Sequence, residues 1–224
     1  MLWRLGLGRA YSSSVLVDQG NCELTVVGWI GLRYADQSLE WAQDLMHFQK
    51  IIDFWFEELP ASAHFRKDPD LDQYIANQFG AVHHAALAGE LYSWRYKPLG
   101  RLAEIIVLDQ FSRNIYRDQP RAFAADGQAL ILAQEAIRAR ADEELSQTQR
   151  VFMYMPYMHS ESEAIQNASL RLYEALGLAD NYRFARRHQE IIKEFGRYPH
   201  RNAILGRKST AAEITFLSTA GSSF

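Results

Sequence analysis

The chain has 224 residues, enough for one domain with a sizeable core. Hydrophobic residues make up 48% of it and aromatic residues 12%, which argues against a disordered chain. The net charge of −3 gives no sign of the basic surface that nucleic-acid-binding proteins carry, so we expect no nucleic-acid partner. The single cysteine, Cys22, excludes an intrachain disulfide and a cysteine-based metal site, and it suits a reducing compartment such as the cytoplasm.

The first 45 residues differ from the rest of the chain. Their longest apolar run, residues 25–32, is too short to span a bilayer, so we expect a soluble protein without membrane contact. The opening 17 residues contain arginine and serine but no acid, which loosely resembles a transit peptide. We favour a simpler interpretation, because helical periodicity begins abruptly at Met46. Residues 1–45 are then a poorly ordered extension or a mis-assigned start, and residues 46–224 form the domain.

Two helices are predicted first. One runs from about Met46 to Pro60, with apolar residues at helical spacing. The other begins at Asp68, an N-cap residue followed by Pro69 at the first helical position, and it ends at Gly89.

A third predicted helix begins at Pro98 and ends before the Asp-Gln-Pro sequence at 118–120. A fourth follows it. Their apolar stripes are Leu102, Ile105, Ile106 and Leu108 in the third helix, and Leu130, Ala133 and Ile137 in the fourth.

Two capping boxes come next. Ser146 with Gln149 opens a helix that Pro156 is expected to interrupt. Ser160 with Glu163 is expected to open the following helix in the same way.

The last third of the chain predicts two more helices. Asp180 is the expected N-cap of a helix that ends at Gly196, and residues 199–206 are expected to form one short helical turn. Thr210 with Glu213 forms a capping box for the final helix. Because nothing after the first 45 residues shows strand alternation, we predict an all-α fold of eight or nine helices arranged as antiparallel hairpins.

Three segments carry polar residues at positions where a helix is expected to have a buried face. In the first, Asp109, Arg113 and Arg117 follow one another at intervals of four residues on one helix face. A solvated, salt-bridged face or a buried arginine–aspartate strut explains this pattern as well as a ligand site does. The candidate ligand-binding residues here are Asp109, Gln110, Arg113, Asn114 and Arg117.

The second segment surrounds Ser160. His159 precedes the expected helix start and Glu161 lies in its first turn. Because a helix N-terminus attracts anions and histidine titrates near neutral pH, His159 and Glu161 are candidate catalytic residues. A capping motif without further function is the alternative.

In the third segment, basic residues crowd into a turn bounded by glycine and proline. Planar guanidinium groups suit bidentate binding of a carboxylate or phosphate. The alternative is that they attach the C-terminal helix to the body by ion pairs. The candidates are His200 for catalysis and Arg197, Arg201 and Asn202 for ligand binding, with Arg207 nearby.

The remaining motifs point to no cofactor. A glycine-rich phosphate loop, an HExxH motif and a nucleophile elbow are all missing from the sequence. His159, Glu161, His188 and His200 match no metal-ligand spacing, so we expect no metal. His188 lies on an apolar stripe and is expected to be a hydrogen-bonded core histidine.

Four sequence segments resemble the DUF924 family of uncharacterised, mainly bacterial proteins. They are FWFEE with HFRKD, GRLAEIIVLDQFSRNIYRDQPRAFAAD, FMYMPYMHSES and RHQEIIKEFGRYPHRNAILGRKSTAAEITFL, and the resemblance runs from about Met46 to Phe224. It implies an all-helical fold similar to tetratricopeptide-like hairpin proteins. It implies no activity, because the function of the family is unassigned. The family's motif residues map here onto Asp109, Gln110, Arg113, Asn114, His159, Glu161, Arg197, His200, Arg201 and Asn202.

Three hypotheses follow for these polar segments. They line one enclosed pocket that binds a small anionic molecule, with or without catalysis. Alternatively, they line an open groove of a binding module and clamp an acidic peptide or a C-terminal carboxylate. In the third hypothesis they are a buried ion network that only specifies helix packing, and Arg113→Ala then unfolds the protein.

Overall fold

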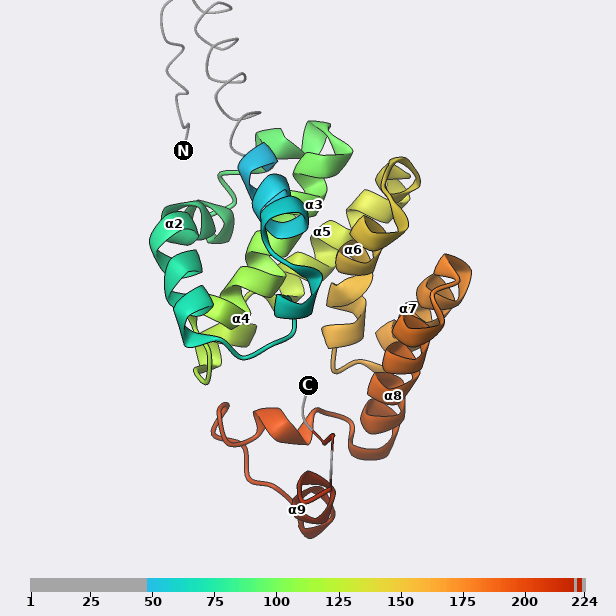
Figure 1. Ribbon diagram of the computed structural model, residues 1–224. Coiled ribbons are helices and arrows are strands. Elements are labelled where there is room, and N and C mark those ends of the chain that lie inside the picture. Colours follow the sequence, from blue (N-terminus) through green and yellow to red (C-terminus); the bar gives the residue numbers. More distant parts are fainter. Residues whose placement is uncertain (1–47, 220, 223–224) are drawn as a thin grey trace, which may run out of the picture. The chain divides into compact units, whose positions relative to one another are not determined.

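A computed structural model describes residues 48–219 and 221–222 of the protein. In this part of the chain all regular structure is helical, which confirms the predicted all-α class (Figure 1). The predictions for residues 1–45 and for a start at Met46 lie outside the described residues. Helical residues 48–53 are followed by α2 (Pro69–Leu87), α3 (Pro98–Ile106), α4 (Ser112–Ile115), α5 (Asp126–Arg138), α6 (Gln147–His159), α7 (Glu163–Leu176), α8 (Ala179–Phe195) and α9 (Ala211–Leu217).

Short 3₁₀ or π-helical turns join these helices. Two of them are π-helical, η1 (Phe54–Glu58) and η4 (Val107–Phe111). The others are the 3₁₀ turns η2 (Ala61–Ala63), η3 (Tyr92–Tyr96), η5 (Pro120–Phe123), η6 (Ala141–Glu144) and η7 (Pro199–Arg201).

The centre of the fold is one continuous helix made of α3, η4 and α4. Every residue from 102 to 112 is buried, so this helix is covered on all sides rather than along one stripe. It packs against α2, α5 and α6. The predicted stripe of four apolar residues was therefore too narrow, and polar side chains of the same helix are buried with it. These are Glu104, Asp109, Gln110, Ser112 and Asn114.

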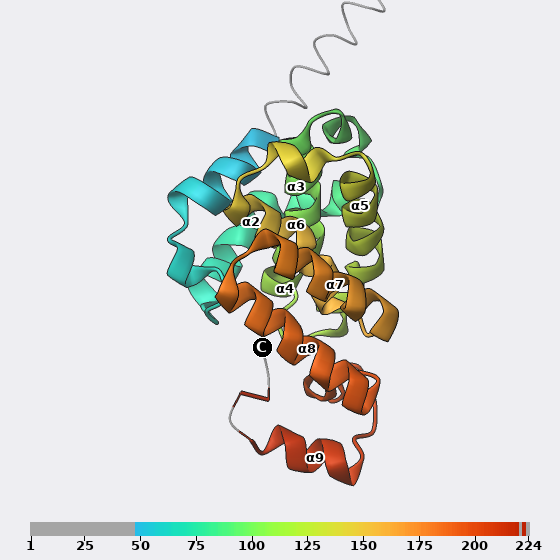
Figure 2. The same cartoon turned by 90° about the vertical axis from the view of Figure 1, so that its right-hand side faces the viewer.

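The helices from α5 to α8 pack consecutively as hairpins. Each of α5, α6 and α7 contacts the next helix, and α7 and α8 lie side by side in Figures 1 and 2. Gly177 ends α7 with a φ of 77°, a left-handed conformation that glycine adopts without steric cost. Gly196 ends α8 in the same way, with a φ of 70°.

Three predicted helix starts are confirmed. The Asp68 side chain accepts hydrogen bonds from the N–H groups of the first turn of α2. Two of the three predicted capping boxes, Ser146 with Gln149 and Thr210 with Glu213, are formed.

Two predicted caps are wrong. α7 begins at Glu163 with Ser162 as its N-cap residue, so Ser160 does not cap it. Glu161 lies before the helix and accepts a hydrogen bond from the N–H of Tyr198 at 2.7 Å. α8 begins at Ala179, and Asp180 lies in its first turn without capping it.

Pro156 does not interrupt α6, which corrects a further prediction. The helix continues to His159 although proline forfeits one backbone hydrogen bond. Gln166 and Tyr198 hold this last turn, since both donate to the carbonyl oxygen of Met158, at 2.8 and 2.5 Å. A carbonyl oxygen of the last turn, which has no donor within the helix, is thereby satisfied from outside it.

Gly100, in the first turn of the central helix, lies in close contact with η3, and this contact predicts an effect on stability. A Cβ at this position would lie 2.1 Å from the carbonyl oxygen of Trp94. We expect Gly100→Ala to lower the free energy of unfolding by about 1–3 kcal/mol, because the η3 backbone must move. Gly80→Ala is the matched control: a Cβ in the interior of α2 meets no atom within 4 Å. It should stabilise the protein by about 0.5–1 kcal/mol in a urea titration. Equal effects of the two substitutions would contradict this packing.

A buried histidine predicts how stability depends on pH. His83 Nε2 lies 2.8 Å from Ser112 Oγ, and burial lowers the pKa of His83 to about 4, with Arg121 and His84 adding to the effect. The unfolded chain protonates this group near pH 6.5, so it binds more protons than the folded protein between about pH 6.5 and 4. Stability therefore falls as the pH drops through this window. His83→Gln should flatten the dependence of the unfolding free energy on pH, whereas exposed His84→Gln should leave it unchanged. Parallel curves for wild type and His83→Gln would refute this assignment.

Candidate functional site

Asp109 lies at the centre of a buried polar network. It is part of the π-helical turn of the central helix and is only 1% exposed. Its carboxylate accepts from Gln110 Nε2 at 2.5 Å and lies 3.3 Å from Arg113 NH1. Burial favours the protonated acid, but Arg113 and His159 outweigh it and hold the pKa of Asp109 well below its usual range. The carboxylate is therefore ionised at neutral pH.

His159 is the last residue of α6 and faces Asp109. Its Nδ1 lies 2.7 Å from Asp109 Oδ1. Since an ionised carboxylate only accepts hydrogen bonds, Nδ1 carries the proton. Burial and Arg113 lower the pKa of His159, against the opposing effect of Asp109. The ring is thus neutral near pH 7 and its Nε2 carries a lone pair, for which no described residue is a hydrogen-bond partner.

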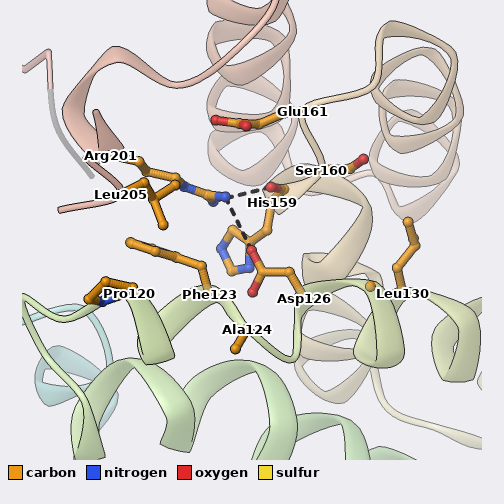
Figure 3. Close-up of a pocket in the computed structure, with 11 residues that line it drawn as sticks. Pro120, Phe123, Ala124, Asp126, Leu130, His159, Ser160, Glu161, Arg201 and Leu205 are labelled. Carbon is orange, nitrogen blue, oxygen red and sulfur yellow. Dashed lines mark hydrogen bonds and ion pairs between the residues drawn. The ribbon is translucent and has the colours of Figure 1, made fainter. Parts of the chain in front are cut away.

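Arg201 reaches the same network from η7. It is 6% exposed, and its guanidinium lies 4.6 Å from the ring centres of both Phe123 and Tyr198. It donates to Asp126 Oδ2 and to the carbonyl oxygen of His159, at 3.1 Å in each case (Figure 3). Burial and Arg113 lower the pKa of Arg201, but a guanidinium stays charged in proteins.

Asp126 joins the two arginines. Its Oδ1 lies 2.9 Å from Arg113 NH1, and its Oδ2 accepts from Arg201. Arg113 in turn donates to the carbonyl oxygen of Asp109 at 2.7 Å. The ionic chain therefore alternates in sign from Asp109 through Arg113 and Asp126 to Arg201.

A pocket of about 360 Å³ lies beside this chain of charges (Figure 3). It is formed by η5, the start of α5, the end of α6 and the segment around η7. Pro120, Ala124 and Gly127 of its wall are exposed, so the pocket opens to solvent. Its lining residues are Pro120, Phe123, Ala124, Asp126, Gly127, Leu130, His159, Ser160, Glu161, Arg201 and Leu205.

The structure brings together one part of each predicted segment. Asp109 and Arg113 form the buried side of the network, and His159 and Arg201 line the pocket. Gln110 donates a hydrogen bond to the Asp109 carboxylate. The three segments therefore meet, as a shared site requires. The catalytic and binding roles assigned to their residues stay predictions.

Glu161 lines the pocket but is held within the protein. Arg207 donates to both of its carboxylate oxygens, at 2.7 and 2.9 Å, and the N–H of Tyr198 donates at 2.7 Å. Burial opposes ionisation, but these hydrogen bonds lower the pKa of Glu161 on balance. An ionised Glu161 suits binding or positioning better than proton donation at neutral pH.

Asn114 and Arg117 lie away from the pocket. Both contact Asp72 of α2, with Asn114 Nδ2 and Arg117 NH2 at 2.8 and 2.7 Å from its Oδ1. The prediction that Asp109, Arg113 and Arg117 share one helix face is wrong. Asp109 and Arg113 do pair across one turn, with Arg113 NH1 3.3 Å from Asp109 Oδ1, but α4 ends at Ile115, so Arg117 lies beyond the helix.

The other predicted residues of the third segment also have partners elsewhere. Arg197 donates to both carboxylate oxygens of Glu213, at 2.6 and 2.8 Å, and so attaches α9 to the body. Asn202 donates to Ser209 Oγ at 3.1 Å. His200 lies beside the Tyr198 ring, and burial and Arg201 lower its pKa to about 4.

His188 is a core histidine, as predicted. It is 6% exposed, and its Nδ1 lies 2.8 Å from the carbonyl oxygen of Phe184. Burial lowers its pKa to about 3.

Sequence reasoning missed several residues that build the site. Asp126, Phe123, Leu130 and Leu205 line the pocket, and Gln166 holds the turn that carries His159. In the sequence Asp126 is only an acid in a first helical turn, and nothing local shows that two arginines share it. Gln166 is fully buried, but a lone glutamine among helical residues gives no signal of burial.

The residues that the structure describes include neither a candidate membrane span nor a candidate metal site. No helix among them has the length and apolar character needed to cross a membrane. Nor does any group of three or more His, Cys, Asp or Glu side chains in this part of the chain have the arrangement of a metal site.

Removal of Arg113 tests the buried ion network. Arg113→Met leaves Asp109 and Asp126 without their shared guanidinium, and we expect a loss of about 3–5 kcal/mol in the free energy of unfolding. The double variant Asp109→Asn with Arg113→Met should recover part of the loss, because it also removes the buried charge. Exposed Arg138→Met is the control and should leave stability unchanged in the same denaturant titration. If Arg113→Met is as stable as wild type, the network does not support the fold.

Comparison with known proteins places the chain in a family. The family model described as a bacterial protein of unknown function (DUF924) matches residues 51–221. A solved structure, the protein of unknown function ATU0120 from Agrobacterium tumefaciens, is 36% identical to the chain, with a TM-score of 0.74. The similarity covers 77% of this chain and 97% of that one. None of the curated proteins compared with it is similar. The chain belongs to the DUF924 family.

Proposed function

We propose that the pocket binds a small anionic molecule, a carboxylate or a phosphate, between Arg201 and the N-terminus of α5. The observation that carries the proposal is a set of hydrogen-bond donors without acceptors beside a pocket of small-molecule size. The Nε of Arg201 is buried and makes no hydrogen bond to any described residue. A buried donor without a partner is costly, and a ligand with acceptor oxygens nearby lowers that cost.

The start of α5 adds backbone donors. Its N-cap residue is Ala125, whose side chain cannot accept a hydrogen bond, and no other side chain caps the helix. The N–H groups of a first helical turn have no acceptor within the helix, and the helix dipole favours an anion there. Asp126 and Gly127 of this turn line the pocket, together with Arg201 and with Ala124, which precedes the N-cap.

His159 supplies a proton acceptor in the same pocket. Asp109 fixes its tautomer and orientation, so that Nε2 is the basic nitrogen. In the proposal this nitrogen accepts a proton or a hydrogen bond from the bound molecule or from a water beside it. Arg113 acts through Asp109 and is a positioning residue.

The size of the pocket supports a small molecule rather than a peptide. Its volume of about 360 Å³ is near the lower end of the range of ligand pockets. Four segments of the chain meet around this one pocket, whereas a groove that binds a peptide extends along a helix or a repeat.

A thermal-shift titration of the full chain tests the proposal. The probes are inorganic phosphate, acetate, succinate and L-leucine. We expect at least one of them to raise the melting temperature in a saturable way, because a ligand at 100 times its dissociation constant adds about 2.7 kcal/mol. Arg201→Lys should weaken that response at least tenfold, since it keeps the charge but loses the planar fork.

The control variant is Arg183→Lys, which changes an arginine that is 70% exposed on α8. It should respond as wild type does. No response of wild type to any probe, or an undiminished response of folded Arg201→Lys, would contradict the proposal.

A further inference from the structure

The lining of the pocket holds both hydrogen-bond donors and hydrogen-bond acceptors. The donors are Arg201 and the first turn of α5, as described above. The acceptors come from the end of α6 and the segment before α7. They are Nε2 of His159 and the Oε2 of Glu161, which accepts only from Arg207 among the described residues. A carboxylate oxygen has room for a second donor.

The charges that line the pocket are already balanced within the protein. Asp126 pairs with Arg201 and Arg113, and Glu161 pairs with Arg207. A doubly charged phosphate would bring two negative charges close to the Asp126 and Glu161 carboxylates. A molecule with one negative and one positive group adds no net charge and finds both donors and acceptors in the lining.

Apolar side chains complete the lining of the pocket. Phe123, Leu130 and Leu205 line the pocket next to the charged residues, and Pro120 lies at its rim (Figure 3). Burial of an aliphatic side chain against such a wall contributes about 25 cal/mol for each Å² removed from water. The ligand is therefore expected to carry an apolar group beside its two charged ends.

We infer that the pocket binds a small zwitterion, an α-amino acid with an apolar side chain. Its carboxylate lies toward Arg201 and the start of α5, its ammonium group lies toward His159 and Glu161, and its side chain contacts Leu130 and Leu205. This inference rests on the proposed anion site and adds the ammonium partner and the apolar contact. Ionised Glu161 and neutral His159 supply the acceptors that an ammonium group requires.

A series of leucine derivatives tests the inference by isothermal titration calorimetry on the full chain. L-Leucine is expected to bind. N-acetyl-L-leucine keeps the carboxylate but lacks the ammonium group, and L-leucinamide keeps the ammonium group but lacks the carboxylate. Each should bind at least tenfold more weakly than leucine. Glycine, which keeps both charges and lacks the side chain, should also bind at least tenfold more weakly.

Glu161→Gln adds a residue-specific test. It should weaken leucine at least tenfold and leave N-acetyl-L-leucine unchanged, whereas Glu190→Gln on the exposed face of α8 should alter neither. The ligand series on wild type gives the same discrimination if Glu161→Gln does not fold.

The outcomes separate the inference from the proposed function. If N-acetyl-L-leucine or phosphate binds as tightly as leucine or more tightly, the inference of a zwitterionic ligand is overturned and the proposed anion site stands. If leucinamide binds as tightly as leucine, or if no carboxylate and no phosphate binds, both are overturned.

Discussion

A carboxylate buried in the central helix constrains the rest of this structure. Asp109 is almost fully shielded from water, in a helix whose neighbouring residues are also buried. An unpaired charge in such a place would cost several kcal/mol, so its partners must be supplied by the fold. Arg113 comes from the same helix, while His159 comes from the far end of α6. The pairing therefore fixes where α6 ends and which way its last side chain faces.

The same constraint extends outward to the pocket. Arg113 cannot be satisfied by Asp109 alone, and its second partner, Asp126, starts α5. Asp126 then attracts Arg201, which brings the C-terminal segment against the start of α5. Each step compensates a charge that the previous step left buried. The last member of this chain, Arg201, is the one whose donors remain partly unused.

The arginines of the C-terminal segment have different roles. Arg197 and Arg207 each bind a carboxylate through two hydrogen bonds, and they attach α9 and the segment before α7. Arg201 shares its carboxylate with Arg113 and lies between two aromatic rings beside the pocket. Family membership and a similar structure of unknown function assign no activity, so any functional argument depends on this site.

The sequence by itself determined the helical class, most helix ends and the three polar segments. These features are local: apolar spacing, the Asp68 cap and the two capping boxes that form act within a few residues of one another. The sequence could not distinguish the arginines that attach helices from the arginine that lines the pocket. This distinction depends on which carboxylate the fold brings next to each guanidinium group. Asp126 and Gln166 carry no local signal, and the helix ends before Arg117, which regular spacing places on the same face as Asp109. Only the tertiary structure decided these points, since a buried charge takes its partner from whichever element packs against it.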